Sequence, residues 1–326
     1  MKLIILFLLQ LSISFSIKAQ RDGQKPYLTQ SLSAESIRNV EVQTSGGRIS
    51  LTGVKESEAR IEVYVNGNNN NELSADEIKK RIEENYELQI SVDKNTVMAK
   101  AKPKKGNMDW KKSLSVSFHV FVPQNTSSEL STSGGSIHLK GLSGTQDFET
   151  SGGSLHVEDV TGKVKGRTSG GSIEAENCSG DIELLTSGGS LDLNSLEGNV
   201  RASTSGGSIA GKNIRGEFTA HTSGGSIRLS DLACSLEAST SGGHINIAIK
   251  DYGKYVRIDN SGGDIDLHLP KGKGIDLDLE ARKVNTTTMA NFKGSIEKDR
   301  VKGTLDGGGI PVKIKAHSGH IDLSMK

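Results

Sequence analysis

The sequence predicts an all-β fold, a single-chain β-solenoid (β-helix) of about 18-residue coils with a small α+β insertion or cap near the N-terminus. Three observations support this prediction. The tetrapeptide Thr-Ser-Gly-Gly recurs at intervals of 18 residues, apolar and polar residues alternate after each copy, and glycines fall where the alternation breaks. The seven regular copies start at Thr132, Thr150, Thr168, Thr186, Thr204, Thr222 and Thr240.

Each unit reads as two short strands joined by two corners. Counting the threonine as position 0, the apolar positions are 5, 7, 10, 14 and 16, which in the fourth copy are Leu191, Leu193, Leu196, Val200 and Ala202. Positions 5 and 7, and 14 and 16, keep the period of two of a half-buried strand. Glycines at positions 2, 3 and 12 are expected at corners because glycine tolerates positive φ.

One coil cannot bury its own apolar face, so the coils are expected to stack with equivalent positions about 4.8 Å apart. The apolar positions then form ladders inside the rod. By the same parity, the threonine at position 0 points inward, where its hydroxyl can bond to stacked neighbours. The serines at positions 1 and 4 point outward.

A first coil is expected upstream of the array, within residues 20–54, because Thr44 begins an isolated Thr-Ser-Gly-Gly with Ile49 and Leu51 at core positions. Residues 55–112 interrupt it and read as an inserted α+β cap that covers the open end of the solenoid. Residues 113–326 form the predicted solenoid repeat domain, entered through a strand over residues 114–122.

Within the predicted cap, Ser74 begins a helix with Glu77 as the partner of a capping box. Ala75, Ile78 and Ile82 form its apolar stripe, and Leu73 is placed to pack on Ile78. Strands are expected on either side of this helix. They are marked by the alternating residues Ile61, Val63 and Val65, then Leu88, Ile90 and Val92, then Val97, Ala99 and Ala101.

Downstream, the variant Asn260-Ser261-Gly262-Gly263 follows the last regular copy at 20 residues. The segment 317–323 resembles a degraded repeat start. It begins 57 residues after Asn260, enough for three coils of about this size.

Residues 1–19 have the pattern of a secretory signal peptide. Lys2 gives the positive start, residues 3–17 are mostly apolar, and Ala19 is a small residue at the expected cleavage point. The apolar run is too short and too interrupted for a transmembrane segment. We therefore expect an exported protein in the periplasm, at the cell surface or secreted.

The composition favours a thin, repeatedly turning structure over a thick enzyme body. Aromatic residues are 4% and hydrophobic residues 33%, whereas glycine supplies 39 of 326 residues, well above the usual ~7%. The net charge of +1 gives no global attraction to nucleic acid or to an anionic membrane. No nucleic-acid partner is expected.

His138 and His156 both occupy position 6, so they are expected to point outward on adjacent coils, with Glu174 and Asp192 next in the column. A His-His-Glu line at strand spacing could hold a transition metal. The alternative is a solvated column that varies freely, and no metal ligand is assigned. The later members of the column are Ala210, Arg228 and Asn246.

The two cysteines are expected not to bond to each other. Cys178 is at core position 10 and Cys234 replaces the corner glycine at position 12. They lie three coils apart, roughly 14 Å by the strand spacing, beyond the Cα separation of about 7 Å that a disulfide allows.

Two further segments are candidate ligand-binding sites. The asparagine-rich loop 66–71 lacks the glycine and the preceding carboxylates of a calcium loop, which favours a polar loop. The lysine-rich stretch 100–112 surrounds Trp110 and could contact anionic glycans or lipid headgroups, or be a solvated hairpin loop.

The Thr-Ser-Gly-Gly-Ser-Ile unit, the upstream Thr44-Ser45-Gly46-Gly47-Arg48-Ile49 coil and the Val122-Pro123 step resemble the bacterial domain family of unknown function labelled "putative adhesin". The resemblance covers roughly residues 36–326. It implies an exported β-solenoid that acts as a surface adhesin or envelope protein. It carries over no catalytic residues.

The expected function is that of a non-catalytic exported β-solenoid, an adhesin or a cell-envelope surface or scaffold protein, with a surface glycan or an envelope protein as partner. The alternative is a carbohydrate-active β-helix enzyme acting on an extracellular polysaccharide. The outward acids Glu174, Asp192 and Asp266 share one column without a second converging column. The protein is therefore predicted not to be an enzyme, and no catalytic, cofactor-binding or metal-binding residue is assigned.

Overall fold

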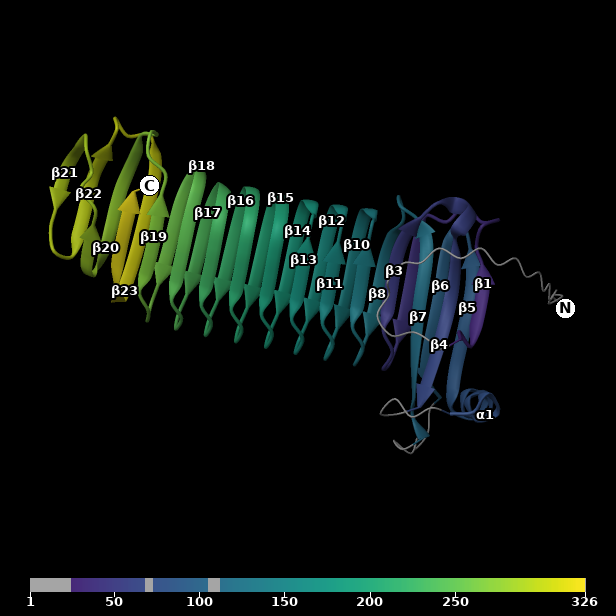
Figure 1. Cartoon of the computed structure of the whole chain (residues 1–326). Coiled ribbons are helices and arrows are strands. Elements are labelled where there is room, and N and C mark those ends of the chain that lie inside the picture. The colour runs from purple at the N-terminus through teal and green to yellow at the C-terminus, as the bar shows by residue number, and fades with distance from the viewer. Residues whose placement is uncertain (1–24, 68–72, 105–111, 326) are drawn as a thin grey trace.

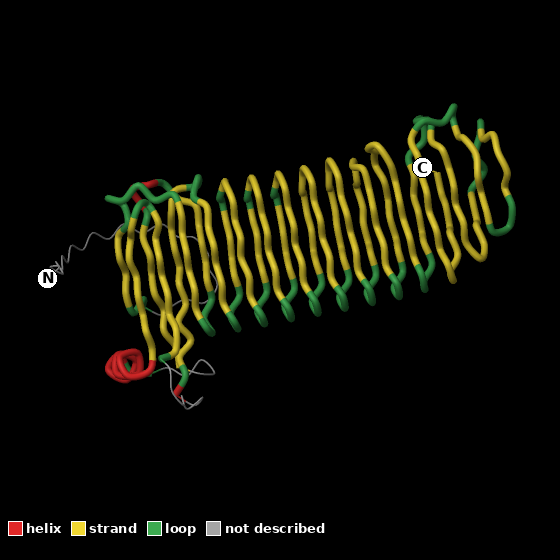
Figure 2. The backbone as a smooth tube through the Cα atoms, turned by 180° about the vertical axis from the view of Figure 1, so that it is seen from behind, coloured by secondary structure: helices red, strands yellow, loops and turns green. Residues whose placement is uncertain are grey.

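The chain folds into a long rod whose coils lie side by side from end to end (Figures 1 and 2). The computed structural model describes residues 25–67, 73–104 and 112–325. The predicted signal peptide, residues 1–19, lies outside the described residues. The rod is all-β apart from one short helix and a 3-10 turn in the described ranges, which confirms the predicted fold class. None of the helical turns described there is long and apolar enough to cross a membrane.

The regular coils have one short strand and one longer strand each. We call the surface outside the short strands the narrow face and the surface outside the longer strands the wide face. The short strands are β9 (Ile137–Lys140), β11 (Leu155–Glu158) and β13 (Ile173–Glu176), and the longer ones are β8 (Ser127–Thr132), β10 (Ser143–Thr150), β12 (Thr161–Thr168) and β14 (Ser179–Thr186). In later coils both parts are continuous, in β15 (Leu191–Thr204), β16 (Ile209–Thr222), β17 (Ile227–Thr240) and β18 (Ile245–Asn260).

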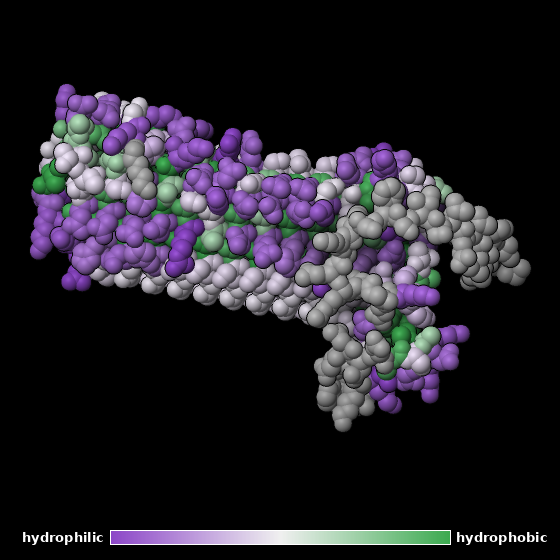
Figure 3. Space-filling view, in the orientation of Figure 1, coloured by the Kyte–Doolittle hydropathy of each residue, from purple (hydrophilic) through white to green (hydrophobic). Residues whose placement is uncertain are grey.

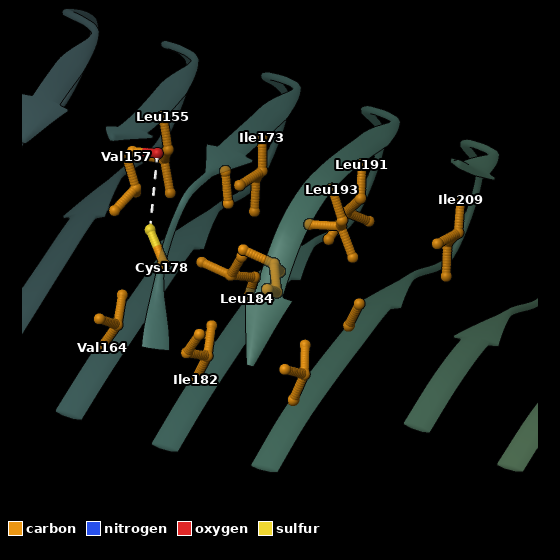
Figure 4. Packing of buried hydrophobic residues seen from close by; sticks show 14 of the residues in the cluster. Leu155, Val157, Val164, Ile173, Cys178, Ile182, Leu184, Leu191, Leu193 and Ile209 are labelled. Carbon is orange, nitrogen blue, oxygen red and sulfur yellow. Dashed lines mark hydrogen bonds between the residues drawn. The ribbon is translucent and has the colours of Figure 1, made fainter. Parts of the chain in front are cut away.

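Neighbouring coils pair in parallel with equivalent positions opposite each other, as the repeat predicts. Ile173 lies opposite Leu191, and Leu191 lies opposite Ile209. The apolar residues at positions 5, 7, 10, 14 and 16 are buried along the array. Figure 4 shows Leu155, Ile173, Leu191 and Ile209 following one another along the inside of the rod.

The threonine at position 0 is buried in all seven regular copies, which confirms its inward direction. Its hydroxyl joins two coils. In Thr186, Oγ1 donates to the carbonyl oxygen of Gly171 in the preceding coil (2.8 Å) and accepts from the backbone N–H of Gly189 (3.3 Å). The hydroxyl therefore ties the corner of its own coil to the corner of the coil before.

The Gly-Gly corner has a different cause from the one predicted. The glycines at positions 2 and 3 of the regular copies do not have positive φ. At position 3 the backbone passes directly over the preceding coil, and a Cβ on Gly189 would overlap the carbonyl oxygen of Gly171. At position 2 there is room, since a Cβ on Gly188 would lie 3.5 Å from the nearest atom, Ser169 O. Position 3 is therefore restricted by close approach and not by dihedral angle.

The second corner does use positive φ, and at two positions. Gly180 at position 12 has φ +120°, as predicted. Position 9 is also left-handed, with Asn177 at φ +54° and Asp231 at φ +55°. The sequence interpretation missed this position, although asparagine and aspartate tolerate the left-handed region better than most residues.

The upstream coil is confirmed. β2 (Asn39–Thr44) and β3 (Ile49–Val54) stack on β8 and β9, with Thr44 opposite Thr132 and Ile49 opposite Ile137.

The interrupting segment continues the same sheets outward. It contains η1 (Glu56–Glu58), β4 (Arg60–Gly67), α1 (Ala75–Asn85), β5 (Tyr86–Asp93) and β6 (Thr96–Pro103), and it is followed by β7 (Leu114–Pro123). β6 pairs with β2, and β7 pairs with β3 on the side away from β9. The chain must therefore step over the first coil to reach β8. The outermost strands are β1 (Leu28–Ser31), which pairs with β4, and β5, which pairs with β6.

Helix α1 begins as predicted. Ser74 Oγ accepts from the backbone N–H of Glu77 (3.3 Å), and the Glu77 carboxylate accepts from Arg81 Nε (2.6 Å). That hydrogen bond is the main reason that the pKa of Glu77 lies below its usual value. Ile78 and Ile82 are buried, but Ala75 is exposed, so the apolar stripe is narrower than expected.

The C-terminal end corrects one prediction. β19 (Ile265–Leu269) is followed by β20 (Ile275–Thr286), β21 (Phe292–Ile296), β22 (Arg300–Leu305) and β23 (Ile310–Met325). The segment 317–323 does have repeat register, since Ile321 lies opposite Ile265. However, it stacks directly on the Asn260 coil and not three coils later. Residues 270–309 lie farther out, where β20 pairs with β23 and β22.

The corner contact predicts a large difference between two adjacent glycines. Gly189→Ala places a methyl group on the Gly171 carbonyl, so we expect a loss of about 3 kcal/mol or more of unfolding free energy. Gly188→Ala, the matched control, is expected to change stability by less than about 1 kcal/mol. Guanidinium denaturation of both variants measures the difference. Equal losses would contradict the close-approach explanation.

Candidate functional site

The Ser-Gly-Gly turns form one long edge of the rod. The serine at position 1 and the glycine at position 2 are exposed in every regular copy. The backbone N–H of Gly188 donates to the carbonyl of Ser169 in the preceding coil (2.9 Å). Figure 3 shows the turns as a continuous strip of intermediate hydropathy along the lower side of the array. The edge is therefore uncharged and evenly spaced.

The serines at position 4 are already engaged along the rod. Ser172 Oγ accepts from the backbone N–H of Ser190 (3.3 Å), and Ser190 Oγ accepts from that of Ser208 (3.1 Å). They stabilise the stacking, while the position 1 serines of the same turn face outward. A shallow hollow of about 350 Å³ lies where this edge meets the wide face, lined in part by Ser151, Arg167 and Ser169.

The wide face carries charges of alternating sign. In the column at position 15, Asp147 lies opposite Lys165, which lies opposite Glu183. Lys165 Nζ is 3.7 Å from Asp147 Oδ2, and Arg167 in the adjacent column is 3.7 Å from Glu183 Oε2. Exposed pairs of this kind contribute only about 0–1 kcal/mol each. They leave the wide face a mixed surface without a single dominant sign.

The narrow face has a shallow groove of about 380 Å³ over four coils. His138 and His156, singled out in the sequence, lie together at one end of it, and Glu174 and Asp192 continue the column as expected. Four carboxylates line the groove, those of Glu158, Glu174, Glu176 and Asp192. The groove is therefore lined by more carboxylates than cationic side chains.

The two histidine rings lie against each other, with centroids 4.4 Å apart and planes tilted by 39°. His156 Nδ1 is 2.8 Å from Glu174 Oε2. An ionised carboxylate can only accept a hydrogen bond, so Nδ1 of His156 carries the hydrogen and Nε2 of the neutral ring is left with its lone pair. Two members of the column, His138 and Glu174, thus contact the imidazole of His156.

The pKa of His138 is lowered to about 4, mainly by burial and then by the nearby His156, Arg48 and His119. Lys140, at position 8 of the same coil, instead forms an ion pair with Glu158 (2.8 Å). His138 is therefore neutral at pH 7.

The acids considered for catalysis lie in a single outward column. Glu174 lies directly opposite Asp192, and Asp266 is held by His244 Nε2 (2.8 Å). The carboxyl groups of a glycosidase flank the scissile bond from two sides, whereas these acids share one column and face the same way. Within the described ranges, no three His, Cys, Asp or Glu side chains are gathered so that they could hold a metal ion.

The cysteines are buried and free. Burial raises the pKa of Cys178 to about 11 and that of Cys234 to about 12. Both are therefore thiols at neutral pH, with low nucleophilic reactivity.

The other two candidate segments fall largely outside the described residues. Trp110 lies within residues 105–111, and most of the asparagine-rich loop lies within residues 68–72, neither of which is described. Of the lysines around Trp110, Lys104 Nζ donates to the carbonyl of Glu83 at the end of α1 (2.5 Å).

Sequence interpretation missed a group of histidine–aspartate pairs where β23 joins the array. His320 Nδ1 is 3.2 Å from Asp264 Oδ1, and His317 Nε2 is 3.3 Å from Asp259 Oδ2. The backbone N–H of His320 also donates to Asp264, and this bond is the main reason that the pKa of Asp264 is lowered. The available signal was that both His320 and Asp264 follow a corner glycine, at position 4.

A family model described as Toastrack DUF4097 matches residues 29–324. Two solved structures similar to the chain are a "putative cell adhesion protein" from Clostridium sporogenes and a "putative adhesin" from Bacteroides fragilis. The first is 13% identical with a TM-score of 0.21, covering 93% of this chain and 100% of that one. The second is 14% identical with a TM-score of 0.29, covering 92% and 96%. No curated protein matches the chain.

The lowered pKa of His138 predicts a pH-dependent stability. Between the ordinary histidine value of about 6.5 and about 4, the unfolded chain binds a proton that the folded chain does not. The free energy of unfolding therefore falls as the pH drops through this window. We expect His138→Asn to lose about 1–2 kcal/mol less than the wild type between pH 7 and pH 4.5, after allowance for solvent screening.

Urea denaturation at the two pH values measures this difference. His221→Asn, on the wide side of the coil, is the matched control and is expected to follow the wild type. Identical pH dependence in the wild type and His138→Asn would contradict the prediction.

Proposed function

The chain belongs to the Toastrack DUF4097 family, and we propose that it is an exported, non-catalytic rod that binds a surface glycan or an envelope protein through its repeated outer faces. The observation that carries the proposal is the periodicity of the surface. Each outward position recurs on neighbouring coils in register. A partner that is itself extended can therefore meet the same kind of contact several times.

Two parts of the surface suit such a partner. The Ser-Gly-Gly edge offers exposed hydroxyl groups, as at Ser169 and Ser187, without charge and without long side chains. The wide face offers alternating carboxylates and cations, as at Asp147 and Lys165. A polysaccharide or an extended polypeptide has donors and acceptors at intervals, so many weak contacts can add along the rod.

Export is proposed from the signal-peptide pattern of residues 1–19. Cell fractionation and protease treatment of intact cells locate the protein. For the surface-adhesin form we expect cleavage in intact cells. Protection until the outer barrier is opened would exclude that form and leave an internal envelope scaffold.

Removal of one whole repeat tests whether the partner binds along the repeated outer faces of the rod. Deletion of residues 187–204 joins Thr186 to Ser205 and leaves the 18-residue register intact, so we expect a folded rod one coil shorter. Its affinity for the glycan or envelope fraction that the wild type retains is expected to fall by about two- to tenfold, because contacts along these faces are lost in part.

Two comparisons make this test selective. Deletion of half a repeat, residues 187–195, is the control and is expected to abolish folding, since it breaks the register. Complete loss of binding in the folded one-coil deletion would indicate a single localised site. Release of reducing ends from a polysaccharide, abolished by Glu174→Gln, would replace the proposal with an enzymatic function.

A further inference from the structure

The side chains in the column at position 6 all point outward, but their chemical type changes along the array. Its histidines are confined to the start of the array, where His138 on β9 lies directly opposite His156 on β11. The two rings lean together until their centroids are 4.4 Å apart, slightly less than the spacing of their strands. The two imidazole rings therefore lie side by side on an accessible surface, since the His156 side chain retains 38% of its exposure.

From this geometry we propose that His138 and His156 form a binding site for a borderline divalent transition-metal ion, of the class of Cu²⁺, Ni²⁺ and Zn²⁺. Imidazole nitrogen is a preferred ligand of these ions. Two nitrogens bound to one ion at about 2.1 Å lie roughly 3–3.5 Å apart, a separation that small rotations of the two rings can reach. Water would complete the coordination in this two-ligand site.

Glu174 orients His156, one of the two proposed ligands. Its carboxylate is 2.8 Å from Nδ1 of His156, which fixes that nitrogen as the hydrogen donor and leaves Nε2 to bind the metal. A histidine that ligates a metal commonly donates its other N–H to a carboxylate in this way, which orients the ring and raises its basicity. Glu174 is therefore a positioning residue here, not a third ligand.

The surroundings favour a cation. The groove that contains both histidines is also lined by Glu158, Glu176 and Asp192. Of these, Glu158 is paired with Lys140 (2.8 Å), and Glu176 accepts from the side-chain amide of Asn194 (3.2 Å). Arg48 is a nearby cation that helps to lower the pKa of His138. The carboxylates outnumber the cations around the rings, so a divalent ion is attracted along the groove.

The histidines differ from those farther along the chain. His244, His317 and His320 each pair with an aspartate. In contrast, His138 and His156 contact each other, and only His156 also pairs with a carboxylate, that of Glu174. The metal site does not depend on the proposed adhesive or scaffold function, since it concerns two side chains and not the repeated outer faces of the rod.

Titration of the full chain with Cu²⁺, purified without a polyhistidine tag, tests the site by calorimetry. We expect one strong equivalent in the wild type, and at least tenfold weaker binding in both His138→Asn and His156→Asn. Asparagine is a suitable replacement because Asn246 occupies the same column. Glu174→Gln is expected to weaken binding by about 10- to 100-fold, the usual effect of losing a supporting carboxylate.

His221→Asn is the matched control, because His221 lies outside the groove and contacts Ser239 (2.8 Å). It is expected to bind Cu²⁺ like the wild type. Electron paramagnetic resonance of the Cu²⁺ complex should show coupling to imidazole nitrogens, lost in either ligand variant, while circular dichroism confirms the fold. Wild-type affinity in both ligand variants, or an equal loss in His221→Asn, would overturn the proposal.

Discussion

The structure depends on the close stacking of one coil on the next at strand spacing. At each Ser-Gly-Gly turn the backbone of one coil passes so near the preceding carbonyl that no Cβ fits, as at Gly189 over Gly171. The same approach brings the buried threonine hydroxyl within 2.8 Å of that carbonyl. Glycine and threonine are thus two parts of one contact, which explains why they recur together at each turn of the array.

Stacking in register also limits where an outward residue can differ from its equivalents on the neighbouring coils. A residue at an outward position meets its equivalents on both sides, so its chemistry is shared along a column. Function that needs an unusual arrangement must therefore come from a break in a column. The change from His156 to Glu174 is such a break, and so is the replacement of serine by His244 and Asp264 at position 4. Elsewhere each column presents a repeated surface along the length of the array.

Much of the fold was predictable because the period records which residues face the core. Leu191, Ile209 and the inward Thr186 followed from parity alone. Strand neighbours outside the regular array were not predictable in this way. A sequence period says that β23 has repeat register, but it does not say which coil it contacts. The site was predictable as a column, whereas the contact of His156 with Glu174 depends on rotamers that no spacing specifies.

The position of β23 has a consequence for the order in which the rod can be completed. β20 pairs with β22 and β23, and β23 in turn pairs with β18 and β19 of the array. In a chain made from its N-terminus the regular coils precede this end, and β23 is the last strand to be made. The pairing of β20 with the rest of the rod through β23 therefore requires a strand that follows residues 270–309 in the chain. A chain interrupted before Ile310 would keep the β18 and β19 edges unpaired, open to another strand.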